Sequence, residues 1–316
     1  KLTHQPEGKD KFVLEQPMPN HTVAISLVME ALQDADHGVI TNTDEISAIG
    51  HRVLHGGMVY SDSVVVNDDV KRVIRECFDL GPLHNPANLM GIRACMELMP
   101  GKPNVAVFDT AFHQTMPEKA YMYAIPYKYY DKYKVRKYGF HGTSHRFVSK
   151  ETIKFLGLDP DNSKVIVAHL GNGSSISAVV NGKCVDTSMG LTPLEGLVMG
   201  TRSGDLDPAV LEFICGKENI DVKEMVRILN KESGLLGLSK GLSSDFRDLN
   251  EAREQGNPDA KRAVDCLCYR IVKYIGSYVA AMNGVHAIAF TGGIGENAIP
   301  VRETVVKSLS YLGITL

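Results

Sequence analysis

The stretch Val105–His113, VAVFDTAFH, decides how the rest of the sequence is interpreted. Its first four residues are apolar and predict a short buried strand, which a carboxylate, Asp109, follows at once. Open α/β sheets present ligand-binding groups at the carboxyl ends of their strands. Because aspartate is rarely buried without a partner, Asp109 indicates a site at the edge of a sheet. The alternative is that Asp109 caps the segment that follows it.

The composition is that of a globular chain and disfavours several function classes. With 316 residues and 44% apolar content, the chain can bury one large or two ordinary cores, and we expect two domains. The net charge of -3, with acids and bases interleaved, predicts binding to neither nucleic acid nor an anionic membrane. No apolar run is long enough to span a bilayer, and the first residues lack a signal-peptide core, so a cytoplasmic location is expected. The six cysteines lack paired metal-ligand spacings and are expected to be reduced.

Helical and strand-like segments alternate in the first third of the chain, which predicts the α/β class. A helix is expected over 21–33, a strand over 48–54, and a second helix that starts with Asn85 as its cap and Pro86 in its first turn. The connection over 116–138 is expected to lead into a second domain. The predicted domains are therefore 1–114 and 115–316.

The predicted second domain opens with a helix that Thr143 or Ser144 caps and that ends near Phe155. Strands are expected over 165–170, 176–180 and 184–186, with Asn181-Gly182 as a type I′ hairpin turn. A long helix over 258–282 and a strand over 287–290 follow.

Both ends of the sequence are abrupt. Phe12–Glu15 is expected to be a strand without a neighbour in this chain, and an isolated strand is not stable. The last residues, 311–316, are also expected to be strand-like. We therefore expect that segments of a longer chain precede Lys1 and follow Leu316.

Two glycine clusters directly follow predicted strands, HLGNGSS at 169–175 and TGGIGEN at 291–297. Such loops allow backbone N–H groups to converge on phosphate oxygens without obstruction by a Cβ. An ordinary hairpin turn is an equal alternative for the first cluster. The second matches G-x-G-x-x-A formally, but it lacks the complete βαβ unit with a following acid that dinucleotide binding requires.

Two arginines lie beside glycine turns, Arg52 in HRVLHGG and Arg202 in GTRSGDLDP. The rigid guanidinium fork donates two parallel hydrogen bonds, which suits carboxylate and phosphoryl groups. The pair therefore indicates an oxyanionic substrate. The alternative is an ordinary surface ion pair, with Asp205 and Asp207 as neighbours that could neutralise Arg202.

Histidine is concentrated between residues 51 and 169. His141 and His145, four residues apart, could bind a metal on a helix, but the glutamate of an H-E-x-x-H motif is missing and zinc is not expected. Hydrogen bonding to an anionic substrate is the functional interpretation, and a structural imidazole with satisfied hydrogen bonds is the alternative. The absence of a G-x-S-x-G motif disfavours a serine hydrolase.

Eight motifs, in this order, resemble the acetate kinase family along essentially the whole chain, and propionate kinases share much of the pattern. They are HRVLHGG, PLHNPANL, FDTAFHQTMP, YGFHGTSH, HLGNGSS, TPLEGLVMGTRSGDLDP, SSDFRD and FTGGIGEN. The resemblance implies an α/β fold with two ribonuclease H-like domains of the actin-like ATPase superfamily and a nucleotide cleft between them. It also implies a homodimer.

The resemblance further implies reversible in-line transfer of the ATP γ-phosphoryl group to acetate, giving acetyl phosphate and ADP, with Mg²⁺ on the nucleotide. Arg52 and Arg202 would hold the carboxylate and the phosphoryl group, His141 would donate to a phosphoryl oxygen, and Asp109 would be the active-site carboxylate. Acetate, with a pKa near that of Glu (about 4.3), is already ionised at pH 7 and needs no strong base. We therefore expect Asp109 to orient the metal or Arg52. A short-chain acyl kinase such as a propionate kinase, and a non-catalytic nucleotide-switched protein, are the alternatives.

The remaining site residues are also implied by the resemblance. Leu54, Leu83 and Pro193 would surround the acetate methyl group. Leu54 replaces a commoner valine, which favours acetate over propionate, although one methylene discriminates by only about 1–3 kcal/mol. Met58 stands where a glutamate usually follows the HGG. The nucleotide would meet His169, Leu170, Gly171, Asn172 and Gly173 at its phosphates, Asp245, Phe246 and Arg247 near the adenosine, and Gly293, Ile294, Gly295, Glu296 and Asn297 on the other side.

The family's Mg²⁺ ligands would lie outside residues 1–316, so no metal ligand is expected in this chain. If these residues were the whole molecule, little kinase activity would be expected.

Overall fold

The α/β order of elements is present in the computed structural model, which describes residues 1–82 and 84–315. The chain forms two units, Lys1–Ala111 and Phe112–Leu316, each with its own hydrophobic core. The division falls a few residues before the predicted boundary between 114 and 115, and that boundary stays a prediction. The two units are described separately below.

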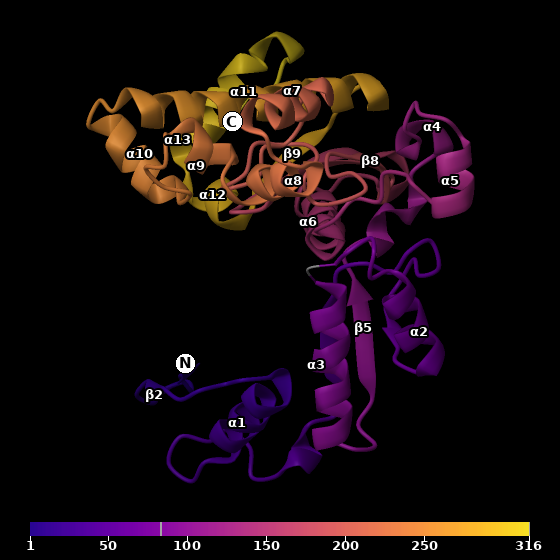
Figure 1. Ribbon diagram of the computed structural model, residues 1–316, viewed down its shortest axis with the longest axis vertical. Coiled ribbons are helices and arrows are strands. Elements are labelled where there is room, and N and C mark those ends of the chain that lie inside the picture. The colour runs from indigo at the N-terminus through magenta and orange to yellow at the C-terminus, as the bar shows by residue number, and fades with distance from the viewer. Residues whose placement is uncertain (83, 316) are drawn as a thin grey trace. The chain divides into compact units, whose positions relative to one another are not determined.

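The first unit contains a three-stranded sheet with the order β3 (Ile49–Val53), β5 (Asn104–Phe108) and β4 (Val64–Val65). Strands β3 and β5 are parallel, with Val53 opposite Phe108, whereas β4 is antiparallel to β5. Parallel strands end at the same edge, so the sheet itself brings the residues around Arg52 close to Asp109. Helix α3 (Asn85–Leu98) runs alongside β5 (Figure 1) and packs on α2 (Asp68–Glu76).

Two predictions for the first unit were wrong. The cap residue of α3 is His84, and Asn85 is the first helical residue, because its side chain turns inward to bond the backbone of other segments. Strand β2 (Phe12–Leu14) does have a neighbour, since it pairs antiparallel with β1 (Leu2–His4). The predicted helix over 21–33 is confirmed as α1 (His21–Gln33), with the Asn20 side chain accepting from the Val23 N–H.

The second unit is built on a four-stranded sheet with the order β8 (Lys183–Thr187), β7 (Ser174–Val180), β6 (Lys164–Leu170) and β9 (Ala287–Thr291). Strand β6 is antiparallel to β7 and parallel to β9. Alternate residues of β6 face opposite layers, because Ile166 and Ala168 pack in the cluster that includes α11 (Pro258–Met282), whereas Val165 and Val167 pack with Ile153 of α6 (Gly142–Phe155). The long helix and the strands were predicted correctly.

The hairpin between β7 and β8 confirms the predicted type I′ turn, since Asn181 has φ 52° and Gly182 has φ 73°. Helix α6, however, does not have Thr143 or Ser144 as its cap. His141 occupies that position in the left-handed region, with φ 57°. The predicted glycine loop at the end of β9 is instead the short helix α12 (Gly292–Asn297). The strand expected over 311–316 is wrong in its described part, where a 3₁₀ turn covers Ser310–Leu312.

The remaining elements are short helices and turns. They are η1 (Thr43–Glu45), η2 (Ala111–Thr115), α4 (Glu118–Tyr121), α5 (Lys128–Tyr133), η3 (Pro160–Asn162), α7 (Ala209–Glu218), α8 (Val222–Lys231), α9 (Gly234–Leu238), α10 (Phe246–Glu254) and α13 (Ile299–Ser308). In the described part of the chain, no helix combines the length and the apolar character that crossing a membrane requires.

Candidate active site

Asp109 and Arg52 form a bidentate ion pair at the end of the sheet in the first unit. Arg52 Nε donates to Asp109 Oδ1 at 2.9 Å, and Arg52 Nη2 donates to Oδ2 at 2.7 Å. The carboxylate residue is only 1% exposed, whereas the Arg52 side chain is 70% exposed. These hydrogen bonds, which Arg52 donates to Asp109, raise the pKa of the Arg52 guanidinium. The buried carboxylate therefore orients the accessible guanidinium of Arg52. Asp109 pairs with Arg52 instead of capping the segment that follows it.

The HGG turn beside this pair is held by side chains from other segments. The Asn88 carbonyl oxygen accepts from the Leu54 N–H, and Asn85 bonds both the N–H and the C=O of His55. Leu54 itself is buried, as a wall residue of an apolar pocket would be. Leu83, predicted for the same pocket, lies outside the described residues.

Arg202 has no carboxylate partner within residues 1–82 and 84–315. Its Nη1 donates to the Pro193 carbonyl at 2.8 Å, while Asp205 is engaged by the Tyr274 hydroxyl and by Arg270. The expectation that Asp205 could neutralise Arg202 is therefore wrong. Burial lowers the pKa of the Arg202 guanidinium. A half-buried cation without a carboxylate partner is suited to receive an anionic ligand.

Backbone hydrogen bonds fix the loop that carries Arg202. Met199 N–H donates to the Arg202 carbonyl at 3.1 Å, and Gly200 N–H donates to the Asn172 carbonyl at 3.0 Å. Gly234 has φ 60° and packs so tightly that an added Cβ would lie 2.1 Å from the Met199 oxygen. The loop is thus tied directly to Asn172 of the HLGNGSS motif.

His141 and Arg202 converge on Gly173. A Cβ built on Gly173 would lie 3.3 Å from Arg202 Nη2 and 3.4 Å from His141 Nε2. The ring of His169 lies beside that of His141, with 4.3 Å between centroids, and its Nδ1 is 2.8 Å from the Ser144 hydroxyl. A guanidinium and an imidazole nitrogen next to a side-chain-free position form a suitable cradle for an oxyanion.

His145 is a fully buried structural member of the same histidine group. Its Nε2 and Nδ1 are each 2.7 Å from a hydroxyl, those of Ser175 and Ser177. Burial, followed by the neighbouring imidazoles of His113, His141 and His169, holds the pKa of His145 well below its ordinary value. The structural interpretation of an imidazole with satisfied hydrogen bonds therefore applies to His145.

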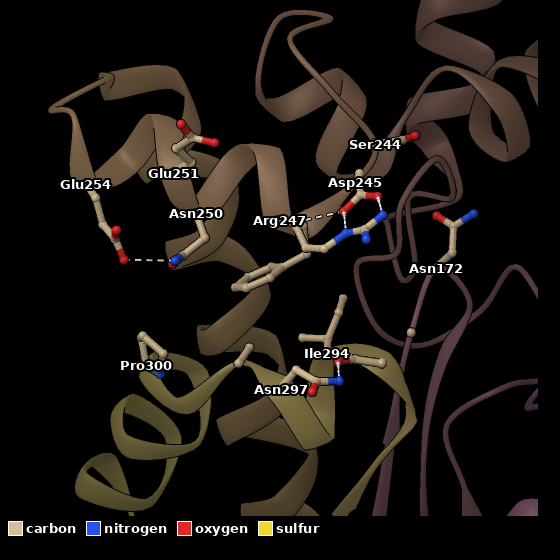
Figure 2. A pocket seen from close by; sticks show the side chains of 14 residues that line it. Asn172, Ser244, Asp245, Arg247, Asn250, Glu251, Glu254, Ile294, Asn297 and Pro300 are labelled. Carbon is tan, nitrogen blue, oxygen red and sulfur yellow. Dashed lines mark hydrogen bonds and ion pairs between the residues drawn. The ribbon is translucent and has the colours of Figure 1, made fainter.

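A cavity of about 920 Å³ opens in the second unit, with Gly171 and Asn172 of the HLGNGSS motif in its lining (Figure 2). Asp245 and Arg247 of α10 lie on one side of it, and Ile294 and Asn297 of α12 lie on another. Asp245 caps α10 and binds Arg247 through Nε at 3.1 Å and Nη2 at 2.6 Å. These bonds lower the pKa of the Asp245 carboxyl to about 2. The volume of this cavity falls within the range typical of small-molecule and cofactor sites.

The cavity gathers most, but not all, of the predicted nucleotide residues. The predicted residues that line it are Gly171, Asn172, Asp245, Phe246, Arg247, Gly293, Ile294 and Asn297. The other five, which are His169, Leu170, Gly173, Gly295 and Glu296, are not in its lining. Leu170 is fully buried in the core, and the Glu296 carboxylate accepts from the Thr291 hydroxyl.

The predicted nucleotide residues account for only part of the cavity wall. The additional lining residues are Ser244, Asn250, Glu251, Glu254, Ala298 and Pro300. Asn250, Glu251 and Glu254 recur along α10, so the helical spacing after the SSDFRD motif could have identified them. Their polar side chains offer hydrogen-bonding groups at the end of the cavity remote from Asn172 (Figure 2).

No three or more His, Cys, Asp or Glu side chains gather in a metal-binding arrangement among the described residues. All six cysteines are free thiols, and burial raises the pKa of Cys77 to about 11.

Comparison with known proteins identifies relatives over the whole chain. Residues 1–316 match the acetokinase family. The sequence is 62% identical to the acetate kinase of Agathobacter rectalis, covering 100% of this chain and 79% of that protein, and 60% identical to the acetate kinase of Lachnoclostridium phytofermentans, covering 100% and 80%.

Solved structures agree with these sequence matches. The acetate kinase of Porphyromonas gingivalis superposes with a TM-score of 0.94 at 49% identity, covering 98% of this chain and 77% of that one. A propionate kinase from Francisella tularensis gives a TM-score of 0.91 at 45% identity, covering 98% and 78%. The predicted fold class, the α/β fold of the actin-like ATPase superfamily, is confirmed. With a family match over every residue and identities above 55% to curated relatives, this chain belongs to the acetokinase family.

Proposed function

We propose that this protein catalyses reversible transfer of the γ-phosphoryl group of ATP to acetate, which gives acetyl phosphate and ADP. The observation that carries the proposal is the half-buried Arg202 guanidinium, which has no carboxylate partner among the described residues and lies next to His141 Nε2 and Gly173. Family membership and the acetate kinases at 62% and 60% identity support the choice of reaction.

Each group has a role that follows from its charge. Arg202 and His141 would donate to the oxygens of the transferring phosphoryl group, because charge on those oxygens must be stabilised in an in-line transfer. Arg52 would bind the acetate carboxylate, with its fork directed by the bidentate contact to Asp109. Asp109 would act through Arg52 rather than as a base, since acetate is already ionised at neutral pH.

The nucleotide would occupy the cavity between α10 and α12, with its phosphates toward Asn172. Asn172 O is bonded by Gly200 N–H, two residues before Arg202, so an occupant of this cavity would have its phosphate end close to the cation. Mg²⁺ would enter with the nucleotide phosphates and neutralise part of their charge. The described residues contain no group of three or more His, Cys, Asp or Glu side chains that could hold it.

Leu54, Leu83 and Pro193 are the residues that the family resemblance implies for the acyl pocket. The Pro193 carbonyl accepts from Arg202 Nη1, so one predicted pocket residue lies directly beside the guanidinium. Leucine at position 54 would leave less room than valine, and acetate would be preferred over propionate. The propionate kinase match at 45% identity makes propionate the second candidate substrate, and comparison of kcat/KM for the two acids decides between them.

The direct test is acetate-dependent ADP formation by the full-length protein, with acetyl phosphate trapped by hydroxylamine. The wild type is expected to be active and Arg202→Ala to lose at least about 100-fold in kcat, as removal of one transition-state donor does. Arg227→Ala is the matched control, because Arg227 is an exposed cation on α8 paired with Glu224 and Glu232. Nucleotide-driven conformational change without acetate-dependent turnover would instead identify a non-catalytic switch.

We also propose that the protein is a homodimer and is cytoplasmic, as the family resemblance implies. Sedimentation of the full-length protein tests the first proposal, and fractionation of the native cells tests the second.

A further inference from the structure

Ser175 of β7 lies between two imidazole rings. Its Oγ is 2.9 Å from His141 Nδ1 and 2.7 Å from His145 Nε2. On the far side of His145, Nδ1 is 2.7 Å from Ser177 Oγ. Ser175, His145 and Ser177 are all 0% exposed, so these hydrogen bonds form a continuous chain shielded from bulk water.

The number of protons on these groups requires the three hydrogen bonds to donate in one direction along the chain. A hydroxyl has one proton, so Ser175 donates to one imidazole and accepts from the other. His145 is neutral because burial lowers its pKa, and it therefore carries one ring proton. All three hydrogen bonds consequently run in the same direction, and two arrangements are available.

Ser177 distinguishes the two arrangements. If the chain runs toward His141, the Ser177 hydroxyl donates to His145 Nδ1 and every proton in the chain has an acceptor. If it runs the other way, the Ser177 hydroxyl accepts from His145 and its own proton needs another acceptor. Within residues 1–82 and 84–315, His145 is the hydrogen-bond partner of that hydroxyl and there is no second one. A buried donor without an acceptor is costly, which favours the first arrangement.

We propose that Ser175, oriented by His145 and Ser177, is a positioning residue that keeps the ring proton of neutral His141 on Nε2. In this arrangement the Ser175 hydroxyl donates to His141 Nδ1, and His141 Nε2 is the atom that faces Gly173 beside Arg202. The role of that proton, donation to a phosphoryl oxygen, rests on the proposed function. The positioning itself does not.

The surroundings of His141 support a neutral ring. Arg202 Nη2 lies near the same point beside Gly173, and a second cation there is unfavourable. The His169 ring lies 4.3 Å from that of His141, and the His113 ring lies 5.6 Å from that of His145, measured between ring centroids.

The tautomer is measured directly by NMR correlation of the imidazole ring nitrogens in the full-length, ¹⁵N-histidine-labelled protein. We expect His141 to carry its proton on Nε2 in the wild type. Ser175→Ala and Ser177→Ala should each give a mixture of tautomers at His141. The first removes the hydroxyl that links His141 to His145, and the second removes the hydroxyl that donates to His145 Nδ1 and so fixes the direction of the hydrogen bonds. Ser149→Ala is the matched control, because Ser149 is a buried serine of α6 whose hydroxyl donates within its own helix, to Arg146 O.

Kinetics give a second readout. Ser175→Ala is expected to lower kcat about 10-fold, the usual size of an effect that acts through a neighbouring ligand group, with the KM values for ATP and acetate retained. Ser149→Ala should change neither. A wild-type His141 with its proton on Nδ1, or a tautomer unchanged in folded Ser175→Ala and Ser177→Ala, overturns the proposal. If the tautomers shift as expected but the wild type does not phosphorylate acetate, the positioning stands and the proposed function fails.

Discussion

At the scale of single residues, the charged side chains of Asp109 and Arg202 differ in their bonding partners. Asp109 is a buried carboxylate that has a bidentate cationic partner, whereas Arg202 is a half-buried cation that, within the described part of the chain, bonds the uncharged groups of Pro193 and Met199. A buried charge is tolerated when it is paired, and an unpaired one has a free-energy cost that a ligand of opposite charge can offset. The first arrangement directs Arg52, and the second prepares Arg202 for an anion.

The Arg52–Asp109 contact predicts a stability effect. Arg52→Ala leaves the Asp109 carboxylate buried without its donor and should lower the free energy of unfolding by about 1–3 kcal/mol in urea denaturation. Arg72→Ala, which breaks exposed contacts to Glu76 and Asp69, should cost less than about 1 kcal/mol. Adding Asp109→Asn to Arg52→Ala should recover part of the loss. An Arg52→Ala protein as stable as the wild type would mean that the pair is not a stabilising contact.

Gly173 gives a prediction about activity without a large change in stability. Gly173→Ala places a methyl group 3.3 Å from Arg202 Nη2 and 3.4 Å from His141 Nε2, where the phosphoryl oxygens are proposed to bind. We expect kcat to fall at least about 10-fold, because small displacements of positioned groups are costly in transfer reactions. The thermal midpoint should remain close to that of the wild type. Gly216→Ala on α7, where an added Cβ meets nothing within 4 Å, is the control, and equal activities of the two variants would contradict the proposed site.

At the scale of elements, functional turns follow strands and are braced by the start of a helix elsewhere. The HGG turn after β3 is braced by Asn85, the first residue of α3, which also donates to the Ile74 carbonyl at the end of α2. One amide side chain thereby connects a strand end and two helices. This explains why Asn85 is buried rather than positioned as an N-cap.

Asn85→Ala should therefore be far more damaging than loss of an ordinary cap. It leaves the N–H and C=O of His55 and the C=O of Ile74 without this amide in a buried position, and we expect a loss of about 3 kcal/mol in the free energy of unfolding. Asn67→Ala, which removes the N-cap bond to Val70 N–H at the start of α2, should cost only about 1 kcal/mol. Equal losses in the two variants would show that Asn85 acts only as a cap.

At the scale of the whole molecule, the histidine group links folding to pH. His145 is fully buried with its pKa held well below the ordinary value of 6.5, so the folded protein keeps it neutral. In the unfolded chain the imidazole binds a proton below about pH 6.5. Unfolding therefore takes up a proton in this range. The stability contributed by His145 is complete above about pH 7 and is lost progressively as the pH falls below 6.5.

Unfolding measured across pH 5 to 8 should show this dependence. The free energy of unfolding is expected to fall by up to about 1.4 kcal/mol per pH unit below pH 6.5 on account of His145. His145→Gln should flatten the profile in this window, even though its stability at pH 8 is lower. A profile of the same slope in both proteins would assign the pH dependence to other groups.

The sequence alone determined the features that depend on local physics. Apolar periodicity and capping residues predicted the helices over 21–33 and 258–282 to the residue. The dipeptide Asn181-Gly182 predicted the type I′ turn between β7 and β8. The resemblance to the acetate kinase family implied eight nucleotide-site residues that line one cavity.

Only the tertiary structure decided which side chains from distant segments meet. The capping position of His141, the buried bracing by Asn85, the hydrogen-bond chain through Ser175 and the α10 wall of the cavity each depend on contacts between segments far apart in the chain. Arg202 shows the reason most clearly. Its sequence neighbour Asp205 suggested a local ion pair. In the fold, Asp205 instead accepts from the Tyr274 hydroxyl and pairs with Arg270, so the Arg202 guanidinium is available to an anionic ligand. Local patterns determine backbone conformation, whereas the pairing of polar groups is settled by the competition among all the donors and acceptors that the fold brings together.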